Sequence, residues 1–144
     1  MANTGTYLKS TDITNNLAKA FLDKGKDLGV YFDWADAQVL NVALQRGVLP
    51  GTIALDTSGN LLDPNLKQYA KNCFYIQLFT DMMGAYNSTD NGNLGSSAYD
   101  KYQKMAESLQ AMQGELLKKI STYTVRNIVN KSDVIISIFE MRRA

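Results

Sequence analysis

The segment from residue 64 to residue 86 constrains the fold more than any other part of the chain. Asp63-Pro64 is a clear helix start, because aspartate accepts hydrogen bonds from the free amides of a first turn and proline fits the first helical position. We predict a helix from Pro64 to about Tyr86. One row at three- and four-residue spacing comprises Leu66, Tyr69, Cys73, Ile76, Thr80 and Met83, and other sides carry Phe74, Leu78, Phe79 and Met82.

A helix that is apolar around most of its circumference is either central in its own domain or shared with another subunit. The sequence leaves both interpretations open. In the second, the candidate subunit interface comprises Phe74, Leu78, Met82 and Tyr86.

Capping signals and apolar periodicity predict three further helices. The first follows Ser10-Thr11-Asp12 and ends near Gly25, with an apolar stripe of Ile13, Leu17, Ala20 and Phe21. The second begins after Asp33 and ends at Gly47, a left-handed cap, with an apolar side of Trp34, Ala37, Leu40, Ala43 and Leu44. After a polar loop at 87–97, the last begins near Ser96 or Ser97 and extends to Tyr123. Residues 52–62 form either an irregular loop or a very short hairpin.

The end of the chain differs from the rest. Residues 134–139 are β-branched and aromatic, which favours a strand, and both of its faces are apolar. A mainly helical domain offers no sheet to receive such a strand, so we expect it to pair outside the domain. We therefore predict a mainly α protein, with a four-helix domain at 1–131, two of its helices long, and a docking tail at 132–144. The partner-binding residues of the tail are Val134, Ile135, Ile136, Ile138 and Phe139.

Several kinds of chemistry are missing from the sequence. The chain has no histidine, which removes the commonest general base and metal ligand, and its single cysteine, Cys73, is interpreted as a small core residue. No phosphate-binding loop or zinc motif occurs. The pairs Asp33/Asp36 and Asp23/Asp27 are interpreted as solvated helix faces, and residues 56–60 as a polar turn. We expect no cofactor, no metal and no enzymatic activity.

Charge and hydropathy set further expectations. The net charge is +1 without a basic stripe, so sequence-specific nucleic-acid binding is not expected. No stretch reaches the length of apolar sequence that crosses a bilayer, and the polar N-terminus does not have the pattern of a signal peptide. We expect a soluble protein that is made in a cytoplasm.

The order of these features resembles the head–tail adaptor, or connector, proteins of tailed bacteriophages. The resemblance covers about residues 7–123. It starts at Tyr7-Leu8-Lys9-Ser10-Thr11-Asp12-Ile13, continues through a helix rich in alanine and leucine to Pro64-Asn65-Leu66-Lys67-Gln68-Tyr69-Ala70, and includes Tyr99-Asp100-Lys101-Tyr102 at the last helix. The resemblance rests on architecture and spacing. Residues 124–133 depart from the pattern.

The resemblance implies a virion protein made in the host cytoplasm, with no enzymatic activity. Its subunits would form a ring, commonly of twelve, that binds the portal protein and a downstream tail or stopper protein. DNA would pass through the lumen without sequence recognition, and no membrane would be involved. Two alternatives stay open: another tail-completion or ring protein, and a small helical dimeric regulatory or partner-binding domain. An enzyme is the least favoured interpretation.

Overall fold

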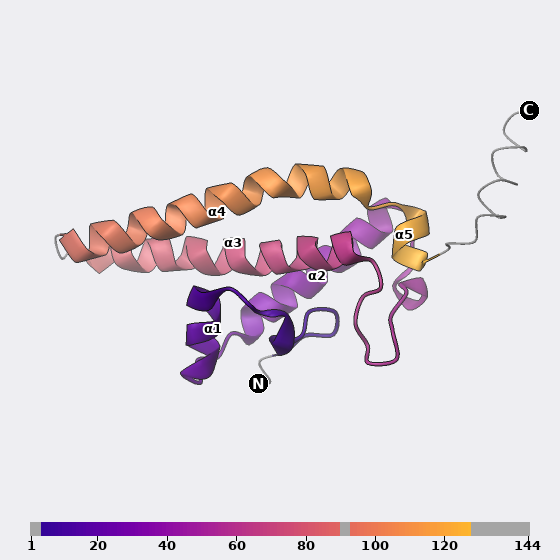
Figure 1. Ribbon diagram of the computed structural model, residues 1–144, viewed down its shortest axis with the longest axis horizontal. Coiled ribbons are helices and arrows are strands. Elements are labelled where there is room, and N and C mark those ends of the chain that lie inside the picture. The colour runs from indigo at the N-terminus through magenta and orange to yellow at the C-terminus, as the bar shows by residue number, and fades with distance from the viewer. Residues whose placement is uncertain (1–3, 90–92, 128–144) are drawn as a thin grey trace, which may run out of the picture.

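Two long antiparallel helices form the frame of the protein (Figure 1). The computed structural model describes residues 4–89 and 93–127, with side chains described for residues 4–83 and 100–127. Among the described elements, α3 (Pro64–Thr89) and α4 (Asn93–Lys119) pack together most extensively, and α2 (Gly29–Gln45) packs against α3. The shorter helices are α1 (Asn16–Asp23) and α5 (Thr122–Arg126). The prediction of a mainly helical fold with two long helices is confirmed.

The start of α3 is the element that the sequence predicted best. The Asp63 carboxylate accepts hydrogen bonds from the amides of Asn65 at 2.9 Å and Leu66 at 3.3 Å, as a helix cap does. The loop predicted at 87–97 is wrong over most of its length, because α3 continues to Thr89 and α4 already begins at Asn93. These residues are helical although asparagine, serine and glycine have poor helix propensity.

The ends of the first two helices differ from the prediction. Residues 10–12 form a separate 3-10 turn, η1 (Ser10–Asp12), and α1 is capped instead by Asn15, whose Oδ1 accepts from the amides of Leu17 and Ala18. Helix α2 begins at Gly29, before Asp33, and the amide of Gly29 donates to Asp27. The left-handed cap at Gly47 is confirmed by a φ of 73°.

The last predicted helix is divided in two. Helix α4 ends at Lys119, and Ser121 starts α5 by accepting a hydrogen bond from the amide of Thr124 at 3.2 Å. The Arg46 guanidinium donates to the carbonyls of Leu117 at 2.9 Å and Ile120 at 2.8 Å. These bonds satisfy carbonyls that a helix end leaves without partners, and they tie the end of α4 to the end of α2.

The segment at 52–62 is a very short hairpin with a polar tip. It follows η2 (Pro50–Thr52), and a single antiparallel bridge joins Leu55 to Leu61. The Asp56 carboxylate accepts from the amides of Ser58 and Asn60, so its oxygens serve the turn. The described residues contain no strand longer than this single bridge.

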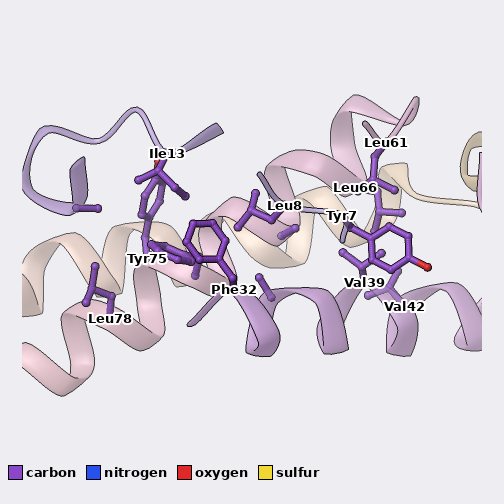
Figure 2. Packing of buried hydrophobic residues seen from close by; sticks show 14 of the residues in the cluster. Tyr7, Leu8, Ile13, Phe32, Val39, Val42, Leu61, Leu66, Tyr75 and Leu78 are labelled. Atoms are coloured by element: carbon purple, nitrogen blue, oxygen red, sulfur yellow. The ribbon is translucent and has the colours of Figure 1, made fainter. Parts of the chain in front are cut away.

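The hydrophobic core lies where α2, α3 and the N-terminal segment (residues 4–15) meet. Figure 2 shows the ring of Tyr7 over α2, close to Val39 and Val42, and Leu8 on the side of Phe32. Aromatic rings extend the core along α3: the centroids of Phe32 and Phe74 are 4.7 Å apart. The predicted domain boundary at 131 and the predicted strand at 134–139 lie outside the described residues, so both stay predictions.

Candidate interaction surfaces

The predicted subunit interface on α3 is wrong for two of its four residues. Phe74 and Leu78 have no exposed surface and belong to the core of their own chain. Met82 is half-buried against that core, and the side chain of Tyr86 is outside the described residues. The reason is that α2 covers this side of α3, so the first interpretation of the apolar helix, a central position in its own domain, holds at Phe74 and Leu78.

Helix α2 buries only part of the predicted side: Ala43 is fully buried and Leu40 is half-buried. Its fully or almost fully buried side chains include Phe32, Ala35, Val39 and Val42. Three members of the predicted apolar side are exposed instead: Trp34 at 43 %, Leu44 at 55 %, and Ala37. Val30, one turn before Trp34, is 67 % exposed. We call Val30, Trp34 and Ala37, which follow one another at four- and three-residue spacing, the outer stripe.

A second exposed apolar surface surrounds the C-terminal end of α2. Its members come from four separate segments, yet hydrogen bonds between those segments bring them together. The amide of Ala54 donates to the carbonyl of Val125 at 2.9 Å, and the amide of Leu62 donates to the carbonyl of Ala54 at 3.2 Å. We call this surface the end patch, and it comprises Leu44, Leu49, Leu55, Leu62 and Tyr123.

The N-terminal segment, residues 4–15, is held against α2 by one carboxylate. Asp36 accepts hydrogen bonds from three consecutive backbone amides: Thr6 at 2.6 Å, Tyr7 at 3.0 Å and Leu8 at 3.1 Å. A Cβ atom on Gly5 would lie 2.5 Å from Asp36 Oδ2, so only glycine allows the backbone this close. The interpretation of Asp36 as part of a solvated face is therefore wrong, and within the pair Asp33/Asp36 it fits exposed Asp33 alone.

Helix α3 holds the same segment at two further points. Lys67 Nζ forms a 2.8 Å ion pair with Asp12 and also donates to Asn60 Oδ1 at 3.2 Å. The Tyr75 hydroxyl accepts from the amides of Thr14 and Asn15. The three anchors bury Tyr7 and Leu8 and set the position of the segment relative to α2. Nothing in the spacing of these residues along the sequence marks the contacts, which join positions about 30 to 60 residues apart.

A polar layer crosses the interface between α3 and α4. Asn72, which is fully buried, accepts from Gln68 at 2.9 Å and donates to Gln113 Oε1 at 3.1 Å. Gln113 in turn donates to the carbonyl of Tyr69 and to Cys73 Sγ, both at 3.3 Å. These bonds form only when Gln113 of α4 lies level with Asn72 of α3 along the helix axes. The layer therefore favours one register between the two helices.

Cys73 lies in that layer and is buried, as the sequence predicted. Burial raises the pKa of its thiol from 9.0 to about 11, although hydrogen bonds from Gln113 and Tyr69 act in the opposite direction. A thiol with so high a pKa is almost entirely protonated at neutral pH and is a poor nucleophile.

Two of the hollows on the described surface are open to solvent. One of about 380 Å³ lies between α1, the start of α2 and α3, lined by apolar side chains with Lys26 and Asp27 at its edge. The other, of about 630 Å³, is lined mainly by polar residues of the N-terminal segment and α1. In the part of the chain that the structure describes, no group of three or more Cys, Asp or Glu side chains is placed to hold a metal ion.

Comparison with known proteins gives no match for this chain among protein-family models, curated proteins or solved structures. Of the helices described at 4–89 and 93–127, none combines the length and hydropathy needed to cross a bilayer. The partner-binding residues predicted at 134–139 lie beyond the last described residue, Asn127.

Proposed function

We propose that this chain is a non-enzymatic structural protein of a tailed bacteriophage, a subunit of the ring that joins the portal of the head to the tail. The observation that carries the proposal is the amount of apolar surface that the folded chain leaves uncovered. Eight large apolar side chains are exposed among the described residues, and seven of them belong to the outer stripe or the end patch. Surfaces of this kind are typical of proteins that act by binding other proteins.

Two further features support a structural role. The N-terminal segment is pinned by Asp36, Lys67 and Tyr75, which makes α1, α2 and α3 one body that can transmit a load. The C-terminal residues 134–139, with two apolar faces, are suited to adding a strand to a sheet edge on the portal or on a neighbouring subunit. Burial of each large apolar side chain there contributes roughly 1.5–3 kcal/mol before the cost of ordering the tail.

The experiment is to locate the protein in phage particles and to remove the tail. Mass spectrometry of purified particles, together with antibody labelling in electron micrographs, should find the chain at the neck between head and tail. A variant lacking residues 133–144 should fold as a helical protein and fail to co-purify with the portal protein. The matched control is replacement of the same residues by a polar linker of equal length.

Two results contradict the proposal in different parts. If the chain is absent from complete particles, the structural role is wrong. If the truncated chain binds the portal as well as the full chain does, or unfolds, the docking role of residues 133–144 is wrong. A tight dimer that binds no particle component would favour the regulatory alternative.

A further inference from the structure

The outer stripe and the end patch lie at opposite ends of α2. Val30 and Leu44 are 14 positions apart, which corresponds to roughly 21 Å along a helix axis. Trp34 and Val30 face outward from the first half of the helix, whereas Leu49, Leu55, Leu62 and Tyr123 gather around its last turn. In Figure 1, η2, the hairpin and α5 lie at the end of α2 that is remote from α1.

We propose that the outer stripe of one copy docks on the end patch of a second copy, so that the chain associates head to tail. The two surfaces are different and lie apart. When the outer stripe of one copy binds the end patch of another, the end patch of the first copy and the outer stripe of the second therefore remain free. That geometry is heterologous, and heterologous contacts give rings when the rotation between copies closes. The inference rests on the proposed function only for that closure, since the contact itself follows from the described surfaces.

The charges around the two surfaces are complementary. The only charged side chains within α2 are Asp33 and Asp36, and Asp36 is occupied by the N-terminal segment. Asp33 is exposed beside Val30 and Trp34, so the outer stripe has an acidic margin.

The margin of the end patch is basic. Lys118 and Lys119 end α4, Arg126 ends α5, and all three are exposed. Glu115 pairs with Lys118 at 3.2 Å, and exposed Asp56 lies next to Leu55 in the hairpin, so three positive and two negative side chains leave a net charge of +1 on this margin. Opposite margins attract the two surfaces of neighbouring copies and disfavour contact between two identical surfaces.

The side chains also divide into an anchor and a receiving surface. Trp34 stands near the middle of the outer stripe, flanked by Val30 and by the small Ala37, which leaves room for a partner to approach. Tryptophan is the residue most often found to dominate binding when it is buried at the centre of an interface. The end patch offers four leucines and a tyrosine, which present apolar surface to such an anchor. The contact is small, so we expect association at roughly micromolar concentrations or above rather than a tight complex.

The test uses the full chain and two variants that each destroy one surface, Trp34→Ser and Leu49→Ser. Sedimentation velocity should show the unmodified chain forming species larger than a dimer as its concentration rises. Each variant alone should remain monomeric, with a dissociation constant raised at least roughly tenfold. An equal mixture of the two variants should form a dimer and nothing larger, because Leu49→Ser retains its outer stripe and Trp34→Ser retains its end patch. Met112→Ser, at an exposed apolar residue of α4 outside both surfaces, is the matched control.

Two outcomes overturn the proposal. If Leu49→Ser alone still dimerises, the outer stripe pairs with itself. If the unmodified chain stays monomeric, a second copy does not cover the two surfaces. Removal of residues 133–144 then decides whether the tail of the same chain covers them: association of the truncated chain would indicate the tail, and a truncated chain that stays monomeric would indicate a different protein. If Trp34→Ser unfolds, Val30→Ser, at a residue that is 67 % exposed, replaces it. The proposed role in phage particles is tested separately, by location of the protein in the particle.

Discussion

Removal of the Asp36 carboxylate should weaken the fold without detaching the N-terminal segment. Asp36→Ala deletes three hydrogen bonds from backbone amides. The amide of Thr6 is exposed and can bond to water, whereas those of Tyr7 and Leu8 are partly buried. A hydrogen bond to a charged group contributes about 1.5–3 kcal/mol, so the two partly buried bonds contribute about 3–6 kcal/mol at most. Because both amides donate to the same oxygen, Oδ1, and water can reach them once the carboxylate is gone, we expect a loss of about 2–4 kcal/mol.

Complete detachment of the segment would cost more than this. It would expose Tyr7 and Leu8, which are buried at present, at roughly 1.5–3 kcal/mol each. It would also break the ion pair of Lys67 with Asp12. The segment should therefore stay in place in the variant, while the amides of residues 6–8 lose their partner.

Urea unfolding and amide hydrogen exchange measure the two parts of this prediction. Asp36→Ala should lower the free energy of unfolding by the amount above, which corresponds to roughly 4–16 °C in melting temperature for a chain of this size. Exchange at the amides of Tyr7 and Leu8 should accelerate. Asp36→Asn should have an intermediate effect, because an amide oxygen can still accept at the Oδ1 position while its NH₂ group faces the amide of Thr6. Asp33→Asn, at an exposed position on the same helix, should change neither quantity. Unchanged stability and exchange in Asp36→Ala would refute the reasoning.

Three other predictions follow from single positions. Gly5→Ala should lower the unfolding free energy by about 1–3 kcal/mol in urea, because its Cβ meets Asp36, whereas Gly114→Ala, with no atom within 4 Å of the new Cβ, should raise it by about 0.5–1 kcal/mol. Asn72→Leu should cost about 1–3 kcal/mol in the same assay, because it leaves Gln113 Oε1 without its donor inside the α3–α4 interface, and Gln113→Leu added to it should recover part of the loss. Iodoacetamide should alkylate native Cys73 at pH 8 at least about 100-fold more slowly than the unfolded chain, because burial raises the pKa of the thiol to about 11. Since the unfolded thiol ionises first, the free energy of unfolding should fall as pH rises from 9 through 11, and Cys73→Ala should lack that component.

Local signals in the sequence predict a helix end correctly where only one nearby residue is suited to cap the helix. Asp63 before proline and Gly47 after the second helix are such cases, and the structure confirms both. The start of the first helix was misassigned because Ser10-Thr11-Asp12 and Asn15 are both good caps. Only the packing of Ile13 against the core, together with the hydrogen bonds from the amides of Thr14 and Asn15 to Tyr75, decides between them.

Long-range contacts could not be predicted from one sequence. The role of Asp36 depends on the backbone of residues 6–8, and a backbone amide leaves no trace in the residue types along the chain. The end patch has the same origin, since Leu49, Leu55 and Tyr123 come together only after α5 has packed beside the hairpin. The residues at 134–139 were the predicted docking site, and their apolar character can be read directly from the sequence.

Helix α2 shows why periodicity alone selects the wrong face. It is apolar on two sides, so Phe32, Val39 and Val42 form one acceptable stripe and Val30, Trp34 and Ala37 form another. The second stripe contributes little to the stability of the isolated fold, because its side chains remain largely in water. Substitution of Val30 by serine should therefore change the free energy of unfolding by no more than about 0.5 kcal/mol, as at other exposed positions. A serine at the same position should nevertheless abolish docking of this face. Separation of the two effects at one residue would show that the outward apolar side of α2 serves association and the inward side serves folding.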